Sequence, residues 1–238
     1  MHTPVSDAQC CANQLLAALE SEQRARWLPE MEWVELPLGQ VLFGPDDPIT
    51  HVVFPTTAIL SLLPDVDDGA YAEPAVVGCE GIVGAALFLG DGSAPCRAVV
   101  QRAGLGLQLK AETLKDELDR NAHVLQLLLR HAQALVVQVA QTGVCHFHHS
   151  PEQQLCRRLL LSLDRLPGPS LAMTLERLAS ELRISKTSLL QAAARLRADR
   201  LIECTHDRID VLDRSGLEAR ACECYGVVSK AYDRLLRS

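Results

Sequence analysis

A run of short polar residues at the predicted start of a helix has the chemistry to bind phosphate and the edges of bases. Ser185 can cap this helix. The N–H groups that stay free in the first turn of a helix bind phosphate, and short polar side chains there can reach bases. A glutamine can pair with adenine, and a lysine with guanine, in the major groove of DNA. The residues that we expect to face double-stranded DNA here are Ser185, Lys186, Thr187, Ser188, Gln191 and Arg195.

The elements around this face predict a winged helix-turn-helix. Thr174 caps a first helix with one apolar face, Arg183-Ile184 makes a tight connection, and Ser185 opens the second helix. Two short β-type runs, IECT and RIDVL, follow and form a hairpin. This order is typical of a winged helix, and it adds Thr174 to the residues expected near phosphate. The alternative interpretation is a winged helix that contacts protein, with its basic side chains merely solvated.

Residues 111–147 contain no proline and, before Gly143, no glycine, which predicts one long helix. Apolar residues step along this helix by alternately three and four positions, as in a heptad seam. Other sides of the helix are apolar too, so it has to cover two neighbours, and we expect one of them to be a second copy of the chain. The alternative is a core helix of a single chain. The expected homodimer interface is Leu125, Leu128, Ala132, Leu135 and Val139.

Between Trp33 and about Lys110, short apolar runs alternate with turn signals. The runs VLF, HVVF, ILSLL, AVV and LGLQL are separated by stretches such as GPDDP at 44–48. Strands this short, with turns this frequent, are typical of antiparallel sandwiches and rolls. A short helical segment over residues 12–30 precedes them.

The composition is that of a globular protein of one or two domains. The chain has 238 residues, of which 48% are hydrophobic and 22% charged. Apolar runs stay shorter than the roughly 18–20 residues that span a bilayer, and the N-terminus lacks the pattern of a secretory signal. We therefore expect a cytoplasmic protein with no membrane partner. The nine scattered cysteines are then expected to be reduced thiols.

The net charge of −7 conceals an asymmetry between the two halves of the chain. Residues 1–151 contain 18 acidic and 8 basic side chains, whereas residues 152–214 contain 9 acidic and 11 basic ones. Phosphate binding needs only a locally basic surface. The acidic average therefore does not exclude DNA as a partner of the C-terminal half.

Along nearly its whole length the sequence resembles the Crp/Fnr family of bacterial transcription regulators. The matching stretches are VLFGPDDPITHVVFPTTAILSLL, VVGCEGIVGAALFLG, HHSPEQQLCRRLLL and TLERLASELRISKTSLLQAAARLRADRLI. The resemblance implies an α+β protein in three parts. These are an antiparallel β-roll of the cyclic-nucleotide-binding type over residues 1–115, a dimerisation helix and hinge over 116–149, and a winged helix-turn-helix with a helical tail over 150–238. It also implies a two-fold-related DNA site and RNA polymerase as a partner.

The sequence departs from the family pattern where cyclic AMP binds. In the family, a Gly-Glu pair holds the ribose and an Arg-Ser pair neutralises the cyclic phosphate. Here Gly84-Ala85 lacks the carboxylate, and Cys96-Arg97 places the arginine one residue out of register, which turns a strand side chain to the other face. Cyclic AMP in the usual mode is therefore disfavoured and the effector is unknown. Gly84, Ala85, Cys96 and Arg97 are the residues expected at the remnant pocket, where Cys96 could also act as a thiol sensor.

Cysteines and histidines offer alternative cofactor sites. An Fnr-type iron–sulfur cluster is disfavoured, because Cys10 and Cys11 are adjacent and no further cysteine follows before Cys79. Imidazoles and thiolates suit zinc, copper or haem iron, which makes one stretch near residue 150 a metal candidate, although its residues can equally cap a helix end at the hinge. Cys222 and Cys224 have a spacing too tight for a zinc knuckle, and the preferred interpretation is that they pack in the fold or are simply exposed. The metal candidates are Cys145, His146, His148 and His149, with Cys156 nearby.

The sequence contains no pattern typical of catalysis. A phosphate-cradling glycine loop, a spaced nucleophile–base set and an HExxH motif are all missing. We therefore expect a regulator rather than an enzyme. The alternative function is a ligand-binding, redox-sensing or metal-sensing module whose winged helix contacts protein rather than DNA.

Overall fold

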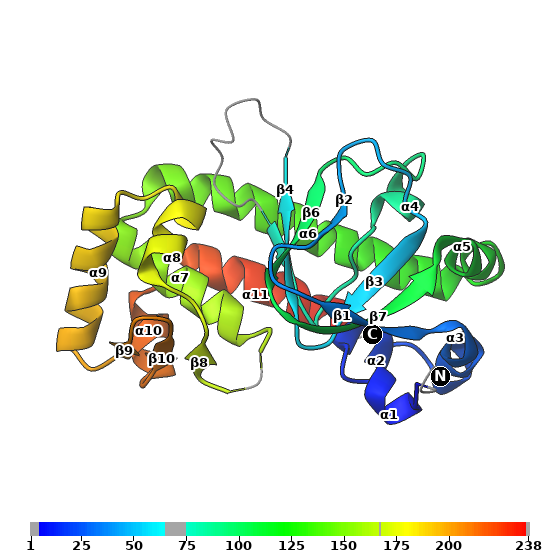
Figure 1. The fold of residues 1–238 in the computed structure, drawn as a ribbon, viewed down its shortest axis with the longest axis horizontal. Coiled ribbons are helices and arrows are strands. Elements are labelled where there is room, and N and C mark those ends of the chain that lie inside the picture. Colours follow the sequence, from blue (N-terminus) through cyan, green and yellow to red (C-terminus); the bar gives the residue numbers. More distant parts are fainter. Residues whose placement is uncertain (1–4, 65–74, 167, 237–238) are drawn as a thin grey trace. The chain divides into compact units, whose positions relative to one another are not determined.

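The computed structural model describes residues 5–64, 75–166 and 168–236, which divide into two units (Figure 1). The β-roll unit comprises the described residues up to 136 together with 231–236, and the winged-helix unit comprises 137–166 and 168–230. The long helix α6 (Ala122–His148) and the C-terminal helix α11 (Glu223–Leu236) contribute residues to both units. Each unit is described by itself.

Two antiparallel sheets form the β-roll unit. One sheet has the strand order β1-β7-β3, and the other has the order β2-β6-β4-β5. The strands of the first are β1 (Glu32–Leu36), β3 (His51–Pro55) and β7 (Gly104–Lys110). Those of the second are β2 (Val41–Phe43), β4 (Ile59–Leu63), β5 (Ala75–Val77) and β6 (Arg97–Arg102). All their pairings are antiparallel, which confirms the roll predicted from the short apolar runs.

Inward-facing aliphatic side chains build the core of the roll. Leu60, Val77 and Val100 come from neighbouring strands of the second sheet and are buried together, and Leu135 of α6 packs into the same cluster. Burying side chains of this kind contributes roughly 1.5–3 kcal/mol each. One face of α6 is therefore covered by the roll of its own chain.

Short helices begin the chain and connect the strands of the roll. The segment predicted as helical over 12–30 is interrupted after Ala18, which ends α2, and α3 begins anew at its cap Glu20. At the start of the segment, the buried side chain of Asn13 caps α2 and donates to the carbonyls of Pro55 and Gly81. The helical elements here are α1 (Asp7–Cys10), α2 (Gln14–Ala17), α3 (Ser21–Trp27), the 3-10 turn η1 (Leu28–Glu30) and α4 (Ala86–Leu89).

The single helix predicted over residues 111–147 is two helices. The first is α5 (Ala111–Arg120), and Asn121 then takes an extended conformation with φ −135° before α6 begins. The Oδ1 atom of Asn121 accepts a hydrogen bond of 3.1 Å from the backbone N–H of His123, which is how a helix start is capped. The prediction of an unbroken helix was therefore wrong at one residue, whose side chain favours a cap over a helix interior.

The winged-helix unit contains a helix-turn-helix followed by a small sheet. Ser150 caps α7 (Pro151–Leu163), and its reciprocal hydrogen bonds with Gln153 complete a capping box. The helix-turn-helix consists of α8 (Leu175–Leu182) and α9 (Lys186–Ala198). The strands β8 (Ser170–Leu171), β9 (Ile202–Cys204) and β10 (Ile209–Val211) form an antiparallel sheet in the order β8-β10-β9, and α10 (Arg214–Arg220) follows. This confirms the predicted winged helix.

Among the helices of the described residues, none is long and apolar enough to cross a membrane.

Candidate functional site

The second helix of the helix-turn-helix, α9, presents a polar face to solvent. Its apolar residues Leu189, Ala192, Ala193 and Leu196 are buried in the winged-helix unit. Helical periodicity therefore turns the intervening residues outward. Of the predicted DNA-binding residues on α9, Lys186, Thr187, Gln191 and Arg195 are exposed and Ser188 is half-buried.

Both helices of the motif begin at a hydroxyl cap. The Oγ1 atom of Thr174 accepts a hydrogen bond of 3.1 Å from the backbone N–H of Arg177. The Oγ atom of Ser185 accepts one of 3.1 Å from the backbone N–H of Ser188, and its hydroxyl also donates to Oγ of Ser188 at 2.8 Å. Thr174 and Ser185 thus cap the two helices, and the side chain of Ser188 is held by its hydrogen bond with the cap residue Ser185.

The turn between α8 and α9 depends on a left-handed residue. Arg183 has φ 55° and ψ 36°, and it ends α8. The N–H of Ile184 then donates to the carbonyl of Ala179 at 3.0 Å, closing the last turn. The tight Arg183-Ile184 connection predicted from the sequence is present.

Acidic neighbours hold the cations of α9 in place. The Nζ atom of Lys186 lies 2.9 Å from Oε1 of Glu176, and Nε of Arg195 lies 3.8 Å from Oε2 of Glu152. The hydrogen bond from Lys186 lowers the pKa of Glu176 below its usual value. The side chains of Lys186 and Glu176 are both more than half exposed, so the pair is screened by solvent and can open for another anion.

Two further basic residues of the winged-helix unit are exposed, on α9 and in the hairpin, and they were not among the residues predicted from the sequence. Arg197 of α9 and Arg208 of the hairpin are both exposed. Arg208 lies 2.9 Å from Asp210 through its Nε atom. In the sequence, Arg197 could have been found from its place on the predicted second helix, and Arg208 from its place next to the predicted hairpin turn.

In the β-roll unit, the predicted effector residues occupy the region between β5 and β6. Gly84 has φ 109°, and a Cβ there would touch Val52 and Ile49, so the backbone needs a glycine. Ala85 directly precedes α4. Cys96 is half-buried, and burial raises the pKa of its thiol, while Arg97 is exposed at the start of β6 opposite Leu63.

The β-roll unit also has a hollow, and its described lining residues are not the predicted effector residues. Its described lining comes from β1, β2, β3 and β7 and from the residues just before β2 and β3, and it includes none of the four predicted effector residues. The lining residues are Val34, Leu36, Gln40, Val41, Leu42, Phe43, Pro48, Ile49, Thr50, His51, Val53 and Gln108.

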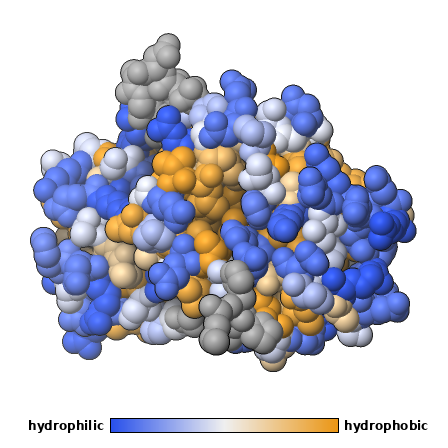
Figure 2. All heavy atoms as spheres, turned by 45° about the vertical axis from the view of Figure 1, so that its right-hand side comes forward, coloured by the Kyte–Doolittle hydropathy of each residue, from blue (hydrophilic) through white to orange (hydrophobic). Residues whose placement is uncertain are grey.

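Only part of the dimer seam predicted on α6 is exposed. Leu128, Ala132 and Leu135 are buried within the chain, Leu125 is half-buried, and Val139 is exposed. Because α6 is apolar on several sides, its own chain covers three of the five predicted residues, and the dimer interface stays a prediction. Apolar atoms do reach the molecular surface, as the orange spheres in Figure 2 show. The large apolar side chains that α6 exposes are Leu129, Val136, Val139, Val144 and Phe147.

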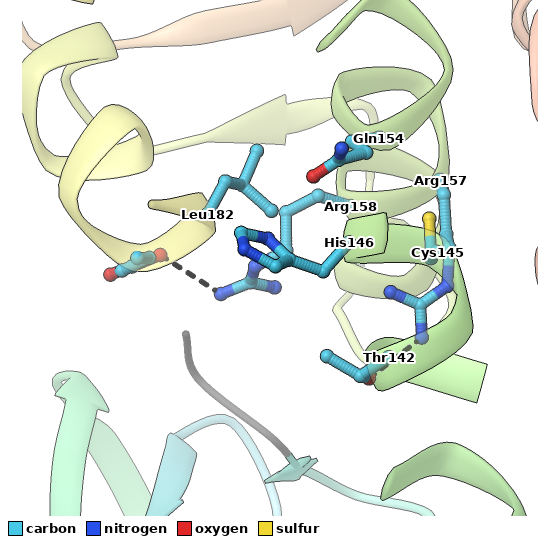
Figure 3. A pocket seen from close by; sticks show the side chains of 8 residues that line it. Thr142, Cys145, His146, Gln154, Arg157, Arg158 and Leu182 are labelled. Carbon is cyan, nitrogen blue, oxygen red and sulfur yellow. Dashed lines mark hydrogen bonds and ion pairs between the residues drawn. The ribbon is translucent and has the colours of Figure 1, made fainter. Parts of the chain in front are cut away.

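A small pocket in the winged-helix unit brings two buried arginines close to the end of α6 (Figure 3). Nη2 of Arg158 lies 3.1 Å from Oε2 of Glu181. Nη2 of Arg157 donates to Oγ1 of Thr142 at 3.0 Å. His146, one of the predicted metal candidates, lines this pocket.

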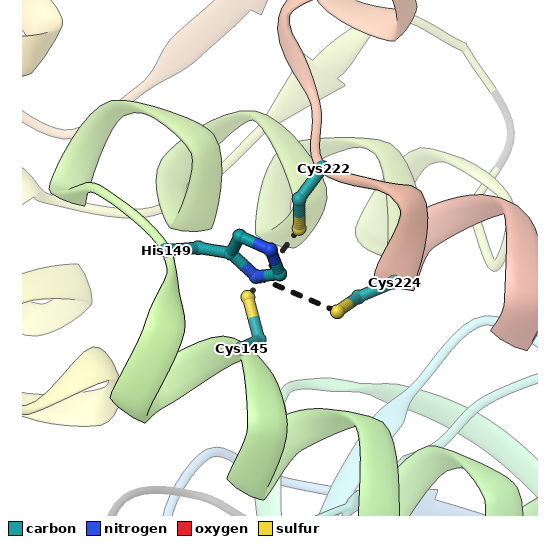
Figure 4. A group of neighbouring side chains, drawn as sticks. All are labelled: Cys145, His149, Cys222 and Cys224. Atoms are coloured by element: carbon teal, nitrogen blue, oxygen red, sulfur yellow. Dashed lines mark hydrogen bonds between the residues drawn. The ribbon is translucent and has the colours of Figure 1, made fainter.

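Next to this pocket, three cysteines and a histidine converge (Figure 4). Cys145 and His149 come from the end of α6 and the residue after it, whereas Cys222 and Cys224 come from the start of α11. Cys145 and His149 were among the metal candidates predicted from the sequence, whereas the contribution of Cys222 and Cys224 was not predicted. His146 and His148 are not members of the group.

The four side chains are within interaction distance of one another. The Sγ atoms of Cys145 and Cys222 are 3.5 Å apart, and Sγ of Cys224 is 3.6 Å from Nδ1 of His149. The hydrogen bond between Cys145 and Cys222 lowers the pKa of Cys222 and raises that of Cys145. Burial, followed by the neighbouring Cys222, raises the pKa of Cys224 to about 11. Cys222 is therefore the sulfur of this cluster that most readily loses its proton.

The fold was compared with solved structures. The chain is similar to FixK2 from Bradyrhizobium japonicum, with a TM-score of 0.67 and 14% identity over 81% of this chain and 98% of that one. It is also similar to the c-di-GMP responsive global regulator CLP from Xanthomonas campestris, with a TM-score of 0.60 and 15% identity over 81% and 99% of the two chains. A CRP-family transcriptional regulator from Thermus thermophilus gives a TM-score of 0.62 and 15% identity over 79% and 96%.

Sequence comparison alone finds no counterpart, since no protein-family model and no curated protein matches the chain. The structural likeness extends over nearly the full length of each solved regulator. It includes both the antiparallel roll and the winged helix described above. The chain therefore has the fold of the Crp/Fnr transcription regulators.

Proposed function

We propose that this protein is a dimeric, sequence-specific DNA-binding transcription regulator of the Crp/Fnr type. The observation that carries the proposal is the outward polar face of α9, whose apolar side is buried and whose start is capped by Ser185. On this proposal Lys186, Thr187, Gln191 and Arg195 face the bases of the major groove. Thr174, Ser185 and Ser188 position the helices near phosphates.

The charges around α9 support a nucleic acid as partner. Arg195 and Arg197 of α9 and Arg208 of the β9–β10 hairpin are exposed. Acidic residues pair with Lys186 and Arg195 in the free protein, but both pairs are solvent-accessible, so phosphates can compete for the cations. On this proposal the wing formed by β9 and β10 makes a second contact, to the sugar-phosphate backbone of the DNA.

The exposed apolar residues of α6 support self-association. Leu129 and Val136 are seven residues apart and lie on one side of the helix, where Val136 has a relative exposure of 68%. We place the dimer interface on this side, in contrast to the buried residues that the heptad pattern favoured. A two-fold dimer brings two α9 helices to successive major grooves, roughly 34 Å apart in the DNA-bound state.

The effector stays unassigned in this proposal. Ala85 stands where the cyclic-AMP-binding members of the family have a carboxylate, so we expect no binding of cyclic AMP in their manner. As a transcription regulator, the protein would act by contacting RNA polymerase or by excluding it from the promoter.

Selection from a library of randomised DNA duplexes tests the proposal. The wild-type protein should enrich a two-fold-related sequence, and Lys186→Ala should weaken binding to it. Lys115→Ala removes another exposed lysine, from the β-roll unit, and serves as the matched control, with affinity unchanged. Enrichment of no sequence by the wild type, with and without reductant and added zinc, would overturn DNA recognition and favour a winged helix that contacts protein.

A further inference from the structure

The side chains of Cys145, His149, Cys222 and Cys224 have the geometry of a metal site. Their four ligand atoms all lie within 4.8 Å of one another. In a tetrahedral zinc site with Zn–S bonds of about 2.3 Å and a Zn–N bond of about 2.0 Å, two sulfurs are about 3.8 Å apart and a sulfur and a nitrogen about 3.5 Å. The observed distances are 3.5 Å between the sulfurs of Cys145 and Cys222 and 3.6 Å between the Cys224 sulfur and the His149 nitrogen.

We propose that these four residues form a tetrahedral Cys₃His site for Zn²⁺. The site concerns a cofactor that DNA recognition does not require, so it goes beyond the function proposed above. Three thiolates and one imidazole are a common closed ligand set of structural zinc. All three cysteines are buried, which keeps their sulfurs together and away from solvent.

Two local patterns hold the ligands in place. Cys145 and His149 are four residues apart and so lie on the same side of the helix end. Cys222 immediately precedes α11, and Cys224 lies in its first turn, where its backbone N–H donates to the sulfur of Cys222. The free N–H groups of a helix start favour thiolates. The tight spacing of Cys222 and Cys224 therefore does not prevent metal binding, because the other two ligands, Cys145 and His149, come from the end of α6.

The surroundings of His149 fix which of its nitrogens faces the cysteines. Its Nε2 atom lies 3.3 Å from Oε1 of Glu223, while its Nδ1 atom points to the sulfur of Cys224. A carboxylate that accepts from the far nitrogen of a histidine leaves the near nitrogen free to bind metal, and it is a frequent partner of zinc-binding histidines. Glu223 is thus a positioning residue for His149.

A buried arginine supplies the charge that such a site needs. Zn²⁺ with three thiolates carries a net charge of −1. Arg157 is buried and lines the same small pocket as Cys145. Within the described part of the chain, its Nε atom has no hydrogen-bond partner and no carboxylate forms an ion pair with it. An isolated buried charge is costly, and an anionic metal–thiolate centre would compensate it.

Metal analysis of the full chain, purified with a thiol reductant and without chelator, tests the proposal. We expect about one zinc per chain by elemental mass spectrometry. Replacement by Co²⁺ should give the intense visible bands of tetrahedral cobalt and a near-ultraviolet thiolate charge-transfer band. Weak octahedral cobalt bands, or wild-type protein that binds neither metal, would overturn the site.

Ligand variants locate the site within the chain. Cys224→Ser should lower the zinc content at least tenfold at equal protein concentration. Cys204→Ser changes a half-buried cysteine on the wing and is the matched control, with zinc content unchanged. His149→Cys should keep the metal and shift the cobalt spectrum to that of four sulfurs, which a merely structural histidine would not do. This variant keeps the test decisive if Cys224→Ser fails to fold.

Two other outcomes would also contradict the proposal. A Cys145–Cys222 disulfide in protein prepared with reductant, seen as a mass lower by two hydrogens, would mean that the cluster is a redox pair. Zinc content that is the same in the wild type and the ligand variants would mean that the metal binds elsewhere. Since neither readout involves DNA, the site can stand or fall independently of the proposed function.

Discussion

The ammonium group of Lys186, at the start of α9, lies 2.9 Å from a carboxylate oxygen of Glu176 on α8. The two helices of the helix-turn-helix are therefore joined by an ion pair on the surface that we assign to DNA. In the free protein Glu176 pairs with the ammonium group of Lys186, which would otherwise be available to a phosphate or a guanine. On the proposed function, Glu176 therefore competes with DNA for Lys186, and its removal should be visible in DNA binding.

Glu176→Gln should therefore bind the selected DNA more tightly, by about twofold to fivefold, which is the range that exposed ion pairs support. The salt dependence should become steeper, because Lys186 becomes available to a phosphate. Fluorescence anisotropy across a series of salt concentrations measures both. The same change at the exposed Glu112 of α5 is the control, and equal gains in both variants would show a mere effect of net charge.

Gln191 is the residue whose change should alter base preference. Its side chain is exposed near the middle of α9, and an amide can pair with adenine through two hydrogen bonds. Gln191→Ala should cost about 1–3 kcal/mol on the selected site and relax the preference at one base pair of each half-site. A base-substitution scan with wild type and variant measures this. A uniform loss across all bases would instead make Gln191 a backbone contact.

Two neighbouring residues of α6 separate dimerisation from folding. Val136 is exposed, so Val136→Glu should give a folded monomer, because an unpaired charge at the interface costs on the order of 3 kcal/mol. Leu135 lies in the core of the roll, so Leu135→Asp should unfold the β-roll unit. Light scattering with circular dichroism distinguishes the two results. Val136→Thr keeps the shape and should stay dimeric, and a Val136→Glu protein that is still a dimer would place the interface elsewhere.

The left-handed conformation of Arg183 predicts how glycine and valine at this position change the stability of the protein. Glycine adopts φ 55° without the steric cost of about 1–2 kcal/mol that other residues meet, although it loses more entropy on folding. Arg183→Gly should therefore raise the free energy of unfolding by up to about 1 kcal/mol. Arg183→Val should lower it, since a β-branched residue tolerates this region least. Urea titration of the three proteins gives the order, and a valine variant as stable as wild type would contradict the assigned conformation.

The ion pair between Arg26 and Glu117 predicts an acid-sensitive contribution to stability. Nη2 of Arg26 donates to Oε1 of Glu117 at 2.6 Å, which lowers the pKa of this carboxyl. A lowered pKa stabilises the fold above the unfolded-state value of roughly 4.3 and ceases to do so as the pH falls through the folded-state value. Glu117→Gln should thus melt below wild type at pH 7 and alongside it near pH 3. Glu112→Gln controls for the loss of a carboxylate, and a constant difference at all pH values would show a packing effect.

The winged helix could be predicted from the sequence because its signals are local. Thr174 and Ser185 are caps followed within one turn by apolar residues at helical spacing, and the structure has both helices starting there. Asn121 shows the limit of such signals. Residues on both sides of it favour a helix, and only the structure shows that its side chain caps a new one.

The face of α6 and the cysteine cluster could not be predicted, for two different reasons. Periodicity identifies an apolar stripe, but it does not say whether Leu135 meets a sheet of its own chain or a second chain. Cys145 and Cys222 are separated by most of the winged-helix unit, and nothing in their local sequence records that the ends of this unit meet. The spacing of Cys222 and Cys224 alone argued against a zinc site, because a local pattern does not show that Cys145 and His149, at the end of another helix, lie beside them.

The contact between Cys145 and Cys222, with sulfurs 3.5 Å apart, also has a consequence for how this chain can be rearranged. The segment 150–221 leaves and re-enters the rest of the molecule at nearly the same place, which is the arrangement of an inserted module. A homologous segment with another α9 could be transplanted between His149 and Cys222, leaving the flanking cysteines and histidine unchanged. On the proposed function, the preference for a DNA sequence could then be exchanged together with this segment, while the β-roll unit and α6 stay unchanged.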